Sequence, residues 1–261
     1  MKGGTRHTDI ALHPQMCYNQ SRKAVFVLYN DNQPKQCVAP LKMLFIGNSA
    51  TYVNDIPGTL VELAKKAGYS LEADSIVKGG ATLSFHASLD TKHGESILKA
   101  IRSGYDIVWL QDNGNCVSGE ENRQASLKAC NVLGTLIRDT GAKVGIYLRP
   151  PYGYEKWGLS PFEQCKEFDL HFLRAADELR SLNAYVNRAF AFAIRDTEYD
   201  LWGKDHAHTS SYGAYLAVCV FFATIFHTSA GVLDASDLPL EDTRALQEIA
   251  DKVALNQEIP W

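Results

Sequence analysis

Three residue types that together can hydrolyse an acyl bond stand in two short motifs far apart in the chain. Ser49 ends a Gly-Asn-Ser motif at residues 47–49, directly after an apolar run, and Asp205 and His208 frame an Asp-His-Ala-His motif at residues 205–208. A serine hydroxyl is a weak nucleophile at neutral pH, so it needs an imidazole to accept its proton and a carboxylate to orient that imidazole. We therefore predict that Ser49, His208 and Asp205 act as nucleophile, general base and orienting acid.

The composition limits the class of protein that carries these motifs. A chain of 261 residues suffices for one large domain with a buried core, and 46% hydrophobic and 21% charged residues are ordinary for a globular protein. The net charge is −4, and acidic and basic residues are scattered along the chain without a block of Lys and Arg that would bind phosphate backbones. Nucleic acid is therefore not expected as a partner. The longest strongly apolar stretch, residues 215–226, is too short to span a bilayer and predicts a buried helix.

The N-terminus and the cysteines leave the cellular compartment open. The first nine residues lack the apolar segment of a secretory signal, so the chain is either cytoplasmic or an exported protein whose leader has been removed. The six cysteines form no Cys-x-x-Cys pair, which argues against a zinc knuckle or a dithiol redox site. Most are expected to be small buried hydrophobes. Cys17 and Cys37 could pair with each other if the protein is exported.

The elements that must position the motifs follow an alternating pattern from residue 42 onward. Short β-branched runs predict strands over residues 42–46, 71–77, 106–111, 143–148 and 184–187. Longer periodic segments predict helices over residues 56–67, 94–103, 120–140, 161–182, 210–227 and 241–256. This alternation is typical of a parallel sheet with helices on both faces. Residues 1–41 break the pattern, so we predict an N-terminal extension, with an extra strand over residues 23–29, and a catalytic domain over residues 42–261.

One loop stands out by its composition. Residues 149–158 follow the fourth predicted strand and combine two prolines, two glycines and three aromatic residues. A loop of this kind beside the strand ends could line a substrate pocket. It could equally be a surface loop whose aromatic side chains cover the edge of the sheet.

Two blocks in the first half of the chain resemble those of the SGNH (GDSL-type) hydrolases. Residues 44–51, Leu-Phe-Ile-Gly-Asn-Ser-Ala-Thr, are similar to the nucleophile block, with Asn48 where many members have Asp. Gly-Asn-Ser is usual in a less characterised branch of that superfamily. Residues 77–83, Val-Lys-Gly-Gly-Ala-Thr-Leu, resemble the second block, whose glycine gives a backbone N–H to the oxyanion hole. Gly80 matches this glycine best, and Gly79 is the alternative.

Two further blocks resemble the same family. Leu-Gln-Asp-Asn-Gly at residues 110–114 matches Gly-x-Asn-Asp in part: Asn113 falls on the asparagine whose amide donates to the oxyanion, Gln111 replaces the glycine, and Gly114 replaces the aspartate. If Asn113 does not act, Gln111 or Asn115 in the same turn is the alternative donor. The fourth block is Asp205-x-x-His208, which completes the triad in the family and leaves His206 as a bystander.

The resemblance spans about residues 42–227 and implies both a fold and an activity. The expected fold is a three-layer α/β/α domain of flavodoxin-like topology with a five-stranded parallel sheet. The expected activity is that of a serine esterase with an oxyanion hole formed by Ser49, Gly80 and Asn113. No metal or organic cofactor is expected. The chain lacks the Gly-x-Ser-x-Gly elbow of α/β-hydrolases because residue 51 is Thr, which favours the SGNH interpretation.

The resemblance also narrows the substrate, and the residues leave two alternatives. Members of this branch resemble enzymes that remove acetyl or other short acyl groups from carbohydrates, and Tyr152, Tyr154 and Trp157 could stack on a sugar ring; a lipid or thioester substrate stays open. As an alternative, Asp205, His206 and His208 have the residue types of a divalent metal site, which would make the protein a metal-dependent hydrolase. As another, the loop after residue 48 could hold the phosphate of FMN in a flavodoxin-like protein, through Ser49, Thr51 and Tyr52.

Overall fold

The computed structural model describes residues 13–18, 24–29, 39–234 and 237–261, which fall into two units, Met1–Ala39 and Pro40–Trp261. In the first unit, strands β1 (His13–Tyr18) and β2 (Ala24–Tyr29) pair antiparallel. β2 corresponds to the strand predicted over residues 23–29, whereas β1 was not predicted. Cys37 lies outside the described residues, so its pairing with Cys17 stays a prediction.

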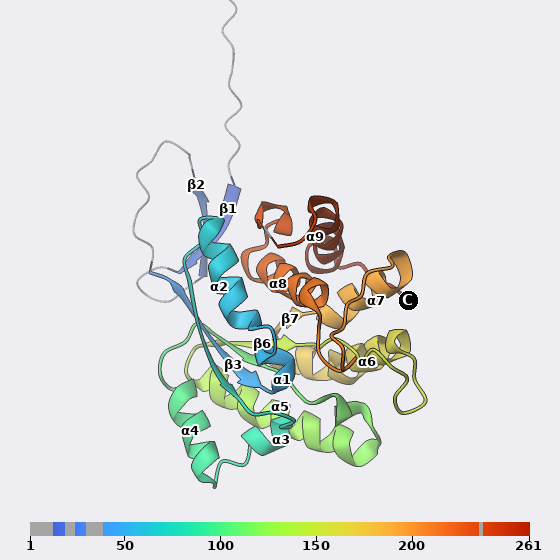
Figure 1. Cartoon of the computed structure of the whole chain (residues 1–261). Helices are drawn as coiled ribbons and strands as arrows, with labels where there is room; N and C mark the ends of the chain where they lie inside the picture. Colours follow the sequence, from blue (N-terminus) through green and yellow to red (C-terminus); the bar gives the residue numbers. More distant parts are fainter. Residues whose placement is uncertain (1–12, 19–23, 30–38, 235–236) are drawn as a thin grey trace, which may run out of the picture. The chain divides into compact units, whose positions relative to one another are not determined.

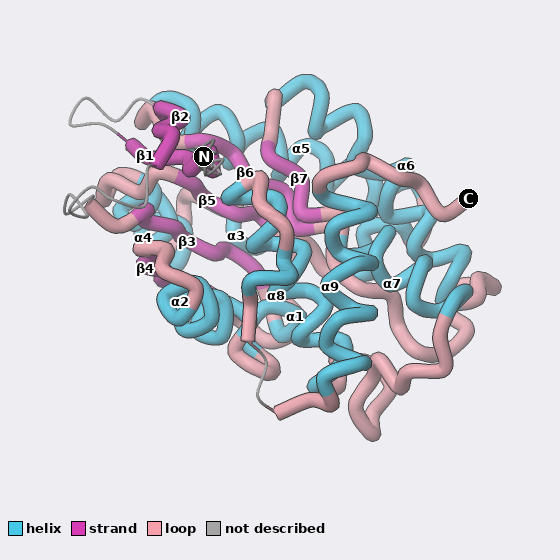
Figure 2. The backbone as a smooth tube through the Cα atoms, turned by 90° about the horizontal axis from the view of Figure 1, so that it is seen from above, coloured by secondary structure: helices cyan, strands magenta, loops and turns pink. Residues whose placement is uncertain are grey.

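The second unit is built on a five-stranded sheet in which all neighbouring strands are parallel. Its strands are β3 (Leu41–Gly47), β4 (Leu71–Val77), β5 (Ile107–Leu110), β6 (Lys143–Tyr147) and β7 (Leu182–Ala184). They lie in the order β4-β3-β5-β6-β7, traced in magenta in Figure 2. This is the flavodoxin-like order, in which the first strand of the domain lies between the second and the third. The predicted fold class is confirmed.

Helices cover both faces of this sheet and make the domain three layers deep (Figure 1). The helices are α1 (Ser49–Tyr52), α2 (Ile56–Lys66), α3 (Leu83–His86), α4 (Lys92–Ile101), α5 (Glu120–Asp139), α6 (Pro161–Leu179), α7 (Val186–Asp196), α8 (Ser211–Phe226) and α9 (Leu240–Ala254), with short 3-10 turns η1 (Gly114–Val117) and η2 (Ala230–Val232). Side chains of α4, α5 and α6 form one core with Leu44, Val108 and Val144 of the sheet. Aromatic side chains build the other face, where Phe221 of α8 contacts Trp109.

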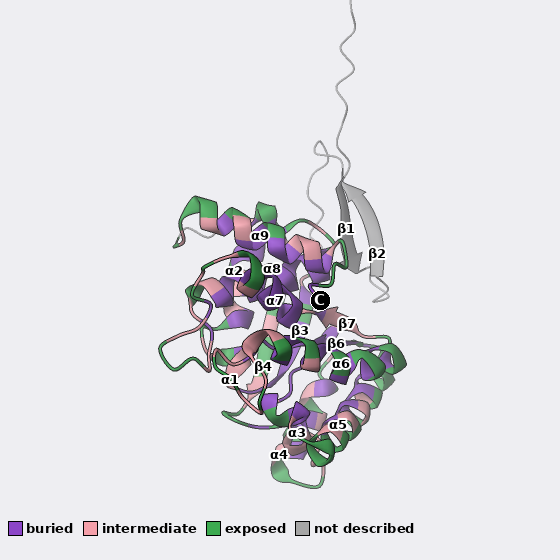
Figure 3. Cartoon of the chain, turned by 90° about the vertical axis from the view of Figure 1, so that its right-hand side faces the viewer, coloured by how far each residue is buried: buried purple, intermediate pink, exposed green. Residues whose placement is uncertain are grey.

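Helix α8 explains the longest apolar stretch of the sequence. Its residues from Gly213 to Phe226 are all buried, because the sheet lies on one side of the helix and α9 packs on another (Figure 3). A helix enclosed in this way needs no polar face. No helix in the part of the chain that the structure describes is both long and apolar enough to span a bilayer.

The prediction of a strand over residues 184–187 was wrong after Ala184. Strand β7 ends at Ala184, and α7 begins at Val186. Every residue from Val186 to Ala193 is buried, so burial marks no single face here, and a short buried run cannot be assigned to helix or strand by its period alone. The one-turn helices α1 and α3 were also not predicted, since four residues are too few to show a period.

Candidate active site

The turns that carry three of the predicted blocks emerge side by side at one edge of the sheet. β3 is hydrogen-bonded to β4 on one side and to β5 on the other, with Gly47 opposite Val77 and Ile46 opposite Leu110. These residues end or nearly end their strands, so the chain turns out of the sheet at the same level in all three. Ligands of open parallel sheets bind at this carboxyl edge.

The first turn presents Ser49 at the N-terminus of a short helix. Asn48 caps α1, and its side-chain oxygen accepts the N–H of Ala50 at 3.1 Å. Ser49 is the first residue of the helix and is half-buried. The first N–H groups of a helix have no partner within it, and among the described residues no acceptor pairs with the N–H of Ser49. That N–H is available to a ligand.

Gln111, which stands where the family has glycine, holds this turn in place. Its side-chain oxygen accepts the Asn48 N–H at 2.8 Å and the Thr51 hydroxyl at 3.0 Å, and the residue is 1% exposed. A Cβ at Gly47 would lie 2.6 Å from that oxygen, so the close approach requires glycine there. The Gln111 amide nitrogen donates to the carbonyl of Asp112. The buried Gln111 side chain therefore supports the nucleophile turn through both its oxygen and its amide nitrogen.

Side-chain amides tie the three turns together. Asn113 donates from Nδ2 to the Gly80 carbonyl at 3.0 Å, and Asn48 donates from Nδ2 to the Ala81 carbonyl at 2.9 Å. Gly80 has a φ of 70°, in the left-handed region that glycine adopts readily. Within the described chain its own N–H meets no acceptor. The Asn113 amide has a second hydrogen, because the bond to Gly80 uses only one of its two.

A buried carboxylate that sequence reasoning missed fixes the backbone beside Asn113. Asp112 accepts the N–H groups of Leu83 and Asn113, both at 2.7 Å, through one oxygen. Burial raises the pKa of Asp112, while hydrogen bonds, first among them one from Ser126, oppose that shift. Ser126 in turn lies 3.1 Å from Nε2 of His171. A single acidic residue directly after a buried strand was the only sequence signal for this network.

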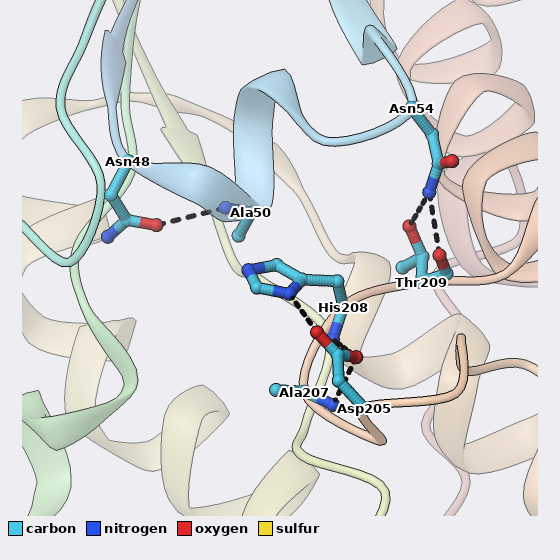
Figure 4. A network of polar contacts seen from close by, with 7 residues as sticks. All are labelled: Asn48, Ala50, Asn54, Asp205, Ala207, His208 and Thr209. Atoms are coloured by element: carbon cyan, nitrogen blue, oxygen red, sulfur yellow. Dashed lines mark hydrogen bonds and ion pairs between the residues drawn. The ribbon is translucent and has the colours of Figure 1, made fainter.

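Asp205 and His208 form the dyad that their spacing predicts. One carboxylate oxygen of Asp205 lies 2.6 Å from Nδ1 of His208, and the other accepts the backbone N–H groups of Ala207 and His208, each at 3.0 Å. The hydrogen bond from His208 holds the pKa of Asp205 well below its usual range. Figure 4 shows the second ring nitrogen of His208 facing the turn between Asn48 and Ala50. Hydrogen bonds from Asn54 to Thr209 connect the loop of the dyad to the segment that follows Ser49.

The backbone of His206 indicates a structural role for this residue. It has a φ of 51°, and its carbonyl accepts the N–H of Gly153 at 2.7 Å. In the described part of the chain, no three His, Cys, Asp or Glu side chains are grouped so that they could hold a metal ion. Asp205, His206 and His208 therefore do not form the metal site considered as an alternative. The Thr51 hydroxyl, considered for phosphate binding, is buried against Gln111.

The aromatic loop after β6 is joined to the loop of the dyad. Besides the bond between Gly153 and His206, the indole N–H of Trp202 donates to the Pro151 carbonyl at 3.0 Å. A Cβ at Gly153 would lie 2.7 Å from the Trp202 ring. The Arg149 and Lys156 cations both lie over the Tyr152 ring, whereas Tyr154 leaves 42% of its surface exposed. The loop thus lies next to the dyad loop, with an aromatic ring open to solvent.

Comparison with known proteins finds solved structures that are similar to this chain. No family model and no curated protein matches the chain. Among solved structures, a candidate SGNH hydrolase from Slackia heliotrinireducens is 25% identical, with 71% of this chain and 99% of that one aligned at a TM-score of 0.61. A DUF4886 family protein from Bacteroides uniformis is 17% identical over 84% and 97% of the chains, with a TM-score of 0.71. A catalytic mutant of Axe2, an acetylxylan esterase from Geobacillus stearothermophilus, is 16% identical over 72% and 94%, with a TM-score of 0.54.

These similarities agree with the architecture already described. The two structures below 25% identity support the fold. The alignment with the 25% identical protein extends over nearly the whole length of that protein. The sheet order is that of the flavodoxin-like folds, and the turns of the first three family blocks lie together at its carboxyl edge. The chain belongs to the SGNH hydrolase superfamily.

Proposed function

We propose that this chain is a serine esterase in which Ser49 is the nucleophile, His208 the general base and Asp205 the orienting acid. The observation that carries the proposal is the 2.6 Å bond between Asp205 and Nδ1 of His208, with the other ring nitrogen facing the Ser49 turn (Figure 4). A carboxylate on Nδ1 keeps the proton there and leaves Nε2 free to accept the serine proton. Ser49 would then attack the ester carbonyl, and His208 would return the proton to the leaving alcohol.

The negative charge on the carbonyl oxygen needs donors fixed before the reaction begins. We assign this role to the N–H groups of Ser49 and Gly80 and to the second amide hydrogen of Asn113. The first two have no acceptor among the described residues, and the third belongs to an amide already oriented by the Gly80 carbonyl. Each such donor contributes roughly 3–4 kcal/mol to lowering the barrier. Neither a metal ion nor an organic cofactor takes part in this mechanism.

We assign the substrate to short acyl esters, acetyl above all, carried on carbohydrates. Axe2, which has a similar fold, is an acetylxylan esterase. In this chain, the loop with Tyr152, Tyr154 and Trp157 is bonded to the loop of the dyad, and the exposed Tyr154 ring offers a flat apolar face. Comparing p-nitrophenyl acetate and octanoate with acetylated xylo-oligosaccharides tests the acyl and alcohol parts separately. Tyr154→Ala should raise KM for the oligosaccharide and leave KM for p-nitrophenyl acetate unchanged.

The nucleophile can be tested without knowledge of the substrate. A fluorophosphonate probe reacts with activated serines, and peptide mapping identifies the modified residue. We expect the label on Ser49, and we expect Ser49→Ala to lose it. Ser84→Ala is a matched control, since that hydroxyl donates to the Ala125 carbonyl and lies outside the proposed machinery. Labelling of a different serine, or ester hydrolysis that survives in Ser49→Ala, would overturn the proposal.

A further inference from the structure

Hydrogen bonds from Asn54 join the two halves of the proposed triad. Its side-chain amide donates to the backbone carbonyl of Thr209 at 2.6 Å and to the Thr209 hydroxyl at 3.0 Å (Figure 4). Asn54 follows the short helix that begins at Ser49, and Thr209 directly follows His208. The bond therefore spans 155 residues of sequence and connects the loop of the nucleophile to the loop of the base.

Both ends of this bridge are held firmly. Asn54 has a φ of 64°, in the left-handed region, and the next residue, Asp55, is also left-handed and caps α2 through its side chain. Thr209 is buried and pairs with Trp202 in an isolated β-bridge. Next to it, the His208 carbonyl accepts the Gly203 N–H at 2.8 Å. The amide thus bonds two backbones that are each fixed by their own loop.

Other hydrogen bonds do not duplicate this bridge. Among the described residues, no other hydrogen bond connects residues 48–55 with residues 205–209. The Asp205 carboxylate orients His208 within its own loop but leaves the distance of that loop from Ser49 unset. That distance decides the reaction, because a misplacement of about 1 Å can cost about 10²-fold in rate.

We propose that Asn54 is a positioning residue, which sets the separation between the Ser49 hydroxyl and the His208 imidazole through its amide bridge to Thr209. The inference rests on the proposed triad, because it gives Asn54 a role only if Ser49 and His208 react together. It adds a residue outside the four family blocks to the proposed machinery.

Asn54→Gly tests the bridge, because glycine keeps the left-handed backbone and removes only the amide. We expect kcat for p-nitrophenyl acetate to fall about 10- to 100-fold with KM nearly unchanged. Fluorophosphonate labelling should slow by a similar factor, since the base must take the same proton. Thr209→Ser keeps both acceptors and should retain normal activity. Thr209→Val keeps only the carbonyl acceptor, so its kcat should lie between those of Asn54→Gly and Thr209→Ser.

Asn122→Ala is the matched control for loss of an amide bridge. The Asn122 amide also donates to a carbonyl and a hydroxyl of one residue, Ser118, at 2.9 and 3.0 Å. The control should leave kcat and labelling unchanged. A folded Asn54→Gly variant with wild-type kcat and labelling rate overturns the inference. If Asn54→Gly does not fold, the inference is overturned when Thr209→Val and Thr209→Ser have the same kcat. If the wild-type protein itself neither hydrolyses the ester nor takes the label, the proposed function fails instead.

Discussion

Nε2 of His86 lies 2.9 Å from the carbonyl oxygen of Gly47, two residues before the proposed nucleophile. A carbonyl can only accept, so Nε2 of His86 carries a proton, and in a neutral His86 the Nδ1 atom accepts from Nε2 of His93, which lies 2.9 Å away. Burial lowers the pKa of His86 to about 4, against smaller opposing effects from the Gly47 carbonyl. A buried neutral imidazole therefore supports the strand end from which Ser49 emerges.

This histidine predicts a stability loss in mild acid. Burial also lowers the pKa of His171 to about 4, while both side chains titrate near 6.5 in the unfolded chain. The unfolded state then binds more protons below pH 6.5, so stability is fully present above that pH and is lost as pH falls toward 4. We expect His86→Gln and His171→Gln each to reduce the difference in unfolding free energy between pH 7 and pH 4.5, measured by urea denaturation. An unchanged difference in both variants would contradict the assignment.

The second prediction concerns the nucleophile. Ser49→Ala should fold normally, because the residue is half-buried and makes no side-chain hydrogen bond in the described structure. Hydrolysis of p-nitrophenyl acetate should fall by at least about 10³-fold, since attack requires the hydroxyl. Steady-state kinetics with circular dichroism as a folding check decide the matter. Wild-type kinetics in the folded variant would rule out Ser49.

Much of the fold and the outline of the site follow from local sequence patterns. Strands β3, β5 and β6 coincide with short, largely buried apolar runs. Parallel strands place their carboxyl ends at one edge, so the positions of Ser49, Gly80 and Asn113 after strand ends were predictable. The dyad was predictable as well, because a carboxylate and an imidazole three residues apart can meet within one loop.

The supporting residues could not be predicted, because their partners lie far away in sequence. Gln111 bonds to a residue 63 positions away, His86 to one 39 positions away, and Asn54 to one 155 positions away. No spacing rule encodes such contacts, which arise only when the strands have been ordered. Gln111 was an alternative oxyanion donor because it lies in the same turn as Asn113, and nothing in the local sequence indicated that its side-chain oxygen bonds to the Ser49 turn.

The third prediction separates the two histidines of the fourth block. His208→Ala should lose nearly all activity, and Asp205→Asn should lower kcat by about 10³- to 10⁴-fold because the imidazole loses its orienting partner. His206→Asn should keep most activity, since asparagine tolerates the left-handed backbone and the His206 carbonyl still accepts from Gly153. Kinetics of all three variants, with and without EDTA, provide the test. Equal losses in the two histidine variants, or inactivation of the wild type by the chelator, would count against the triad.

The fourth prediction addresses the oxyanion hole. Asn113→Ala should lower kcat by roughly 10²- to 10³-fold with little change in KM, because the bond to the oxyanion is made mainly in the transition state. Asn113→Ala also removes the donor to the Gly80 carbonyl. Asn115→Ala, in the same turn, is the control for loss of an asparagine side chain. That variant keeps the backbone N–H that Asn113 accepts and should retain a normal kcat. If Asn115→Ala is impaired and Asn113→Ala is not, the role belongs to Asn115.

The last prediction tests whether Gln111 shapes the nucleophile turn. Gln111→Leu leaves the Asn48 N–H and the Thr51 hydroxyl buried without their acceptor, which should cost about 1–3 kcal/mol for each unpaired group. The Ser49 turn loses its main support, so kcat should fall while KM changes little. Thr51→Val removes only one of the two bonds and keeps the Asn48 N–H paired, so it should lose less stability and retain most of kcat. Urea denaturation and steady-state kinetics on both variants separate the effects. A Gln111→Leu protein that loses stability but keeps its kcat would show that the turn holds Ser49 in position without this side chain.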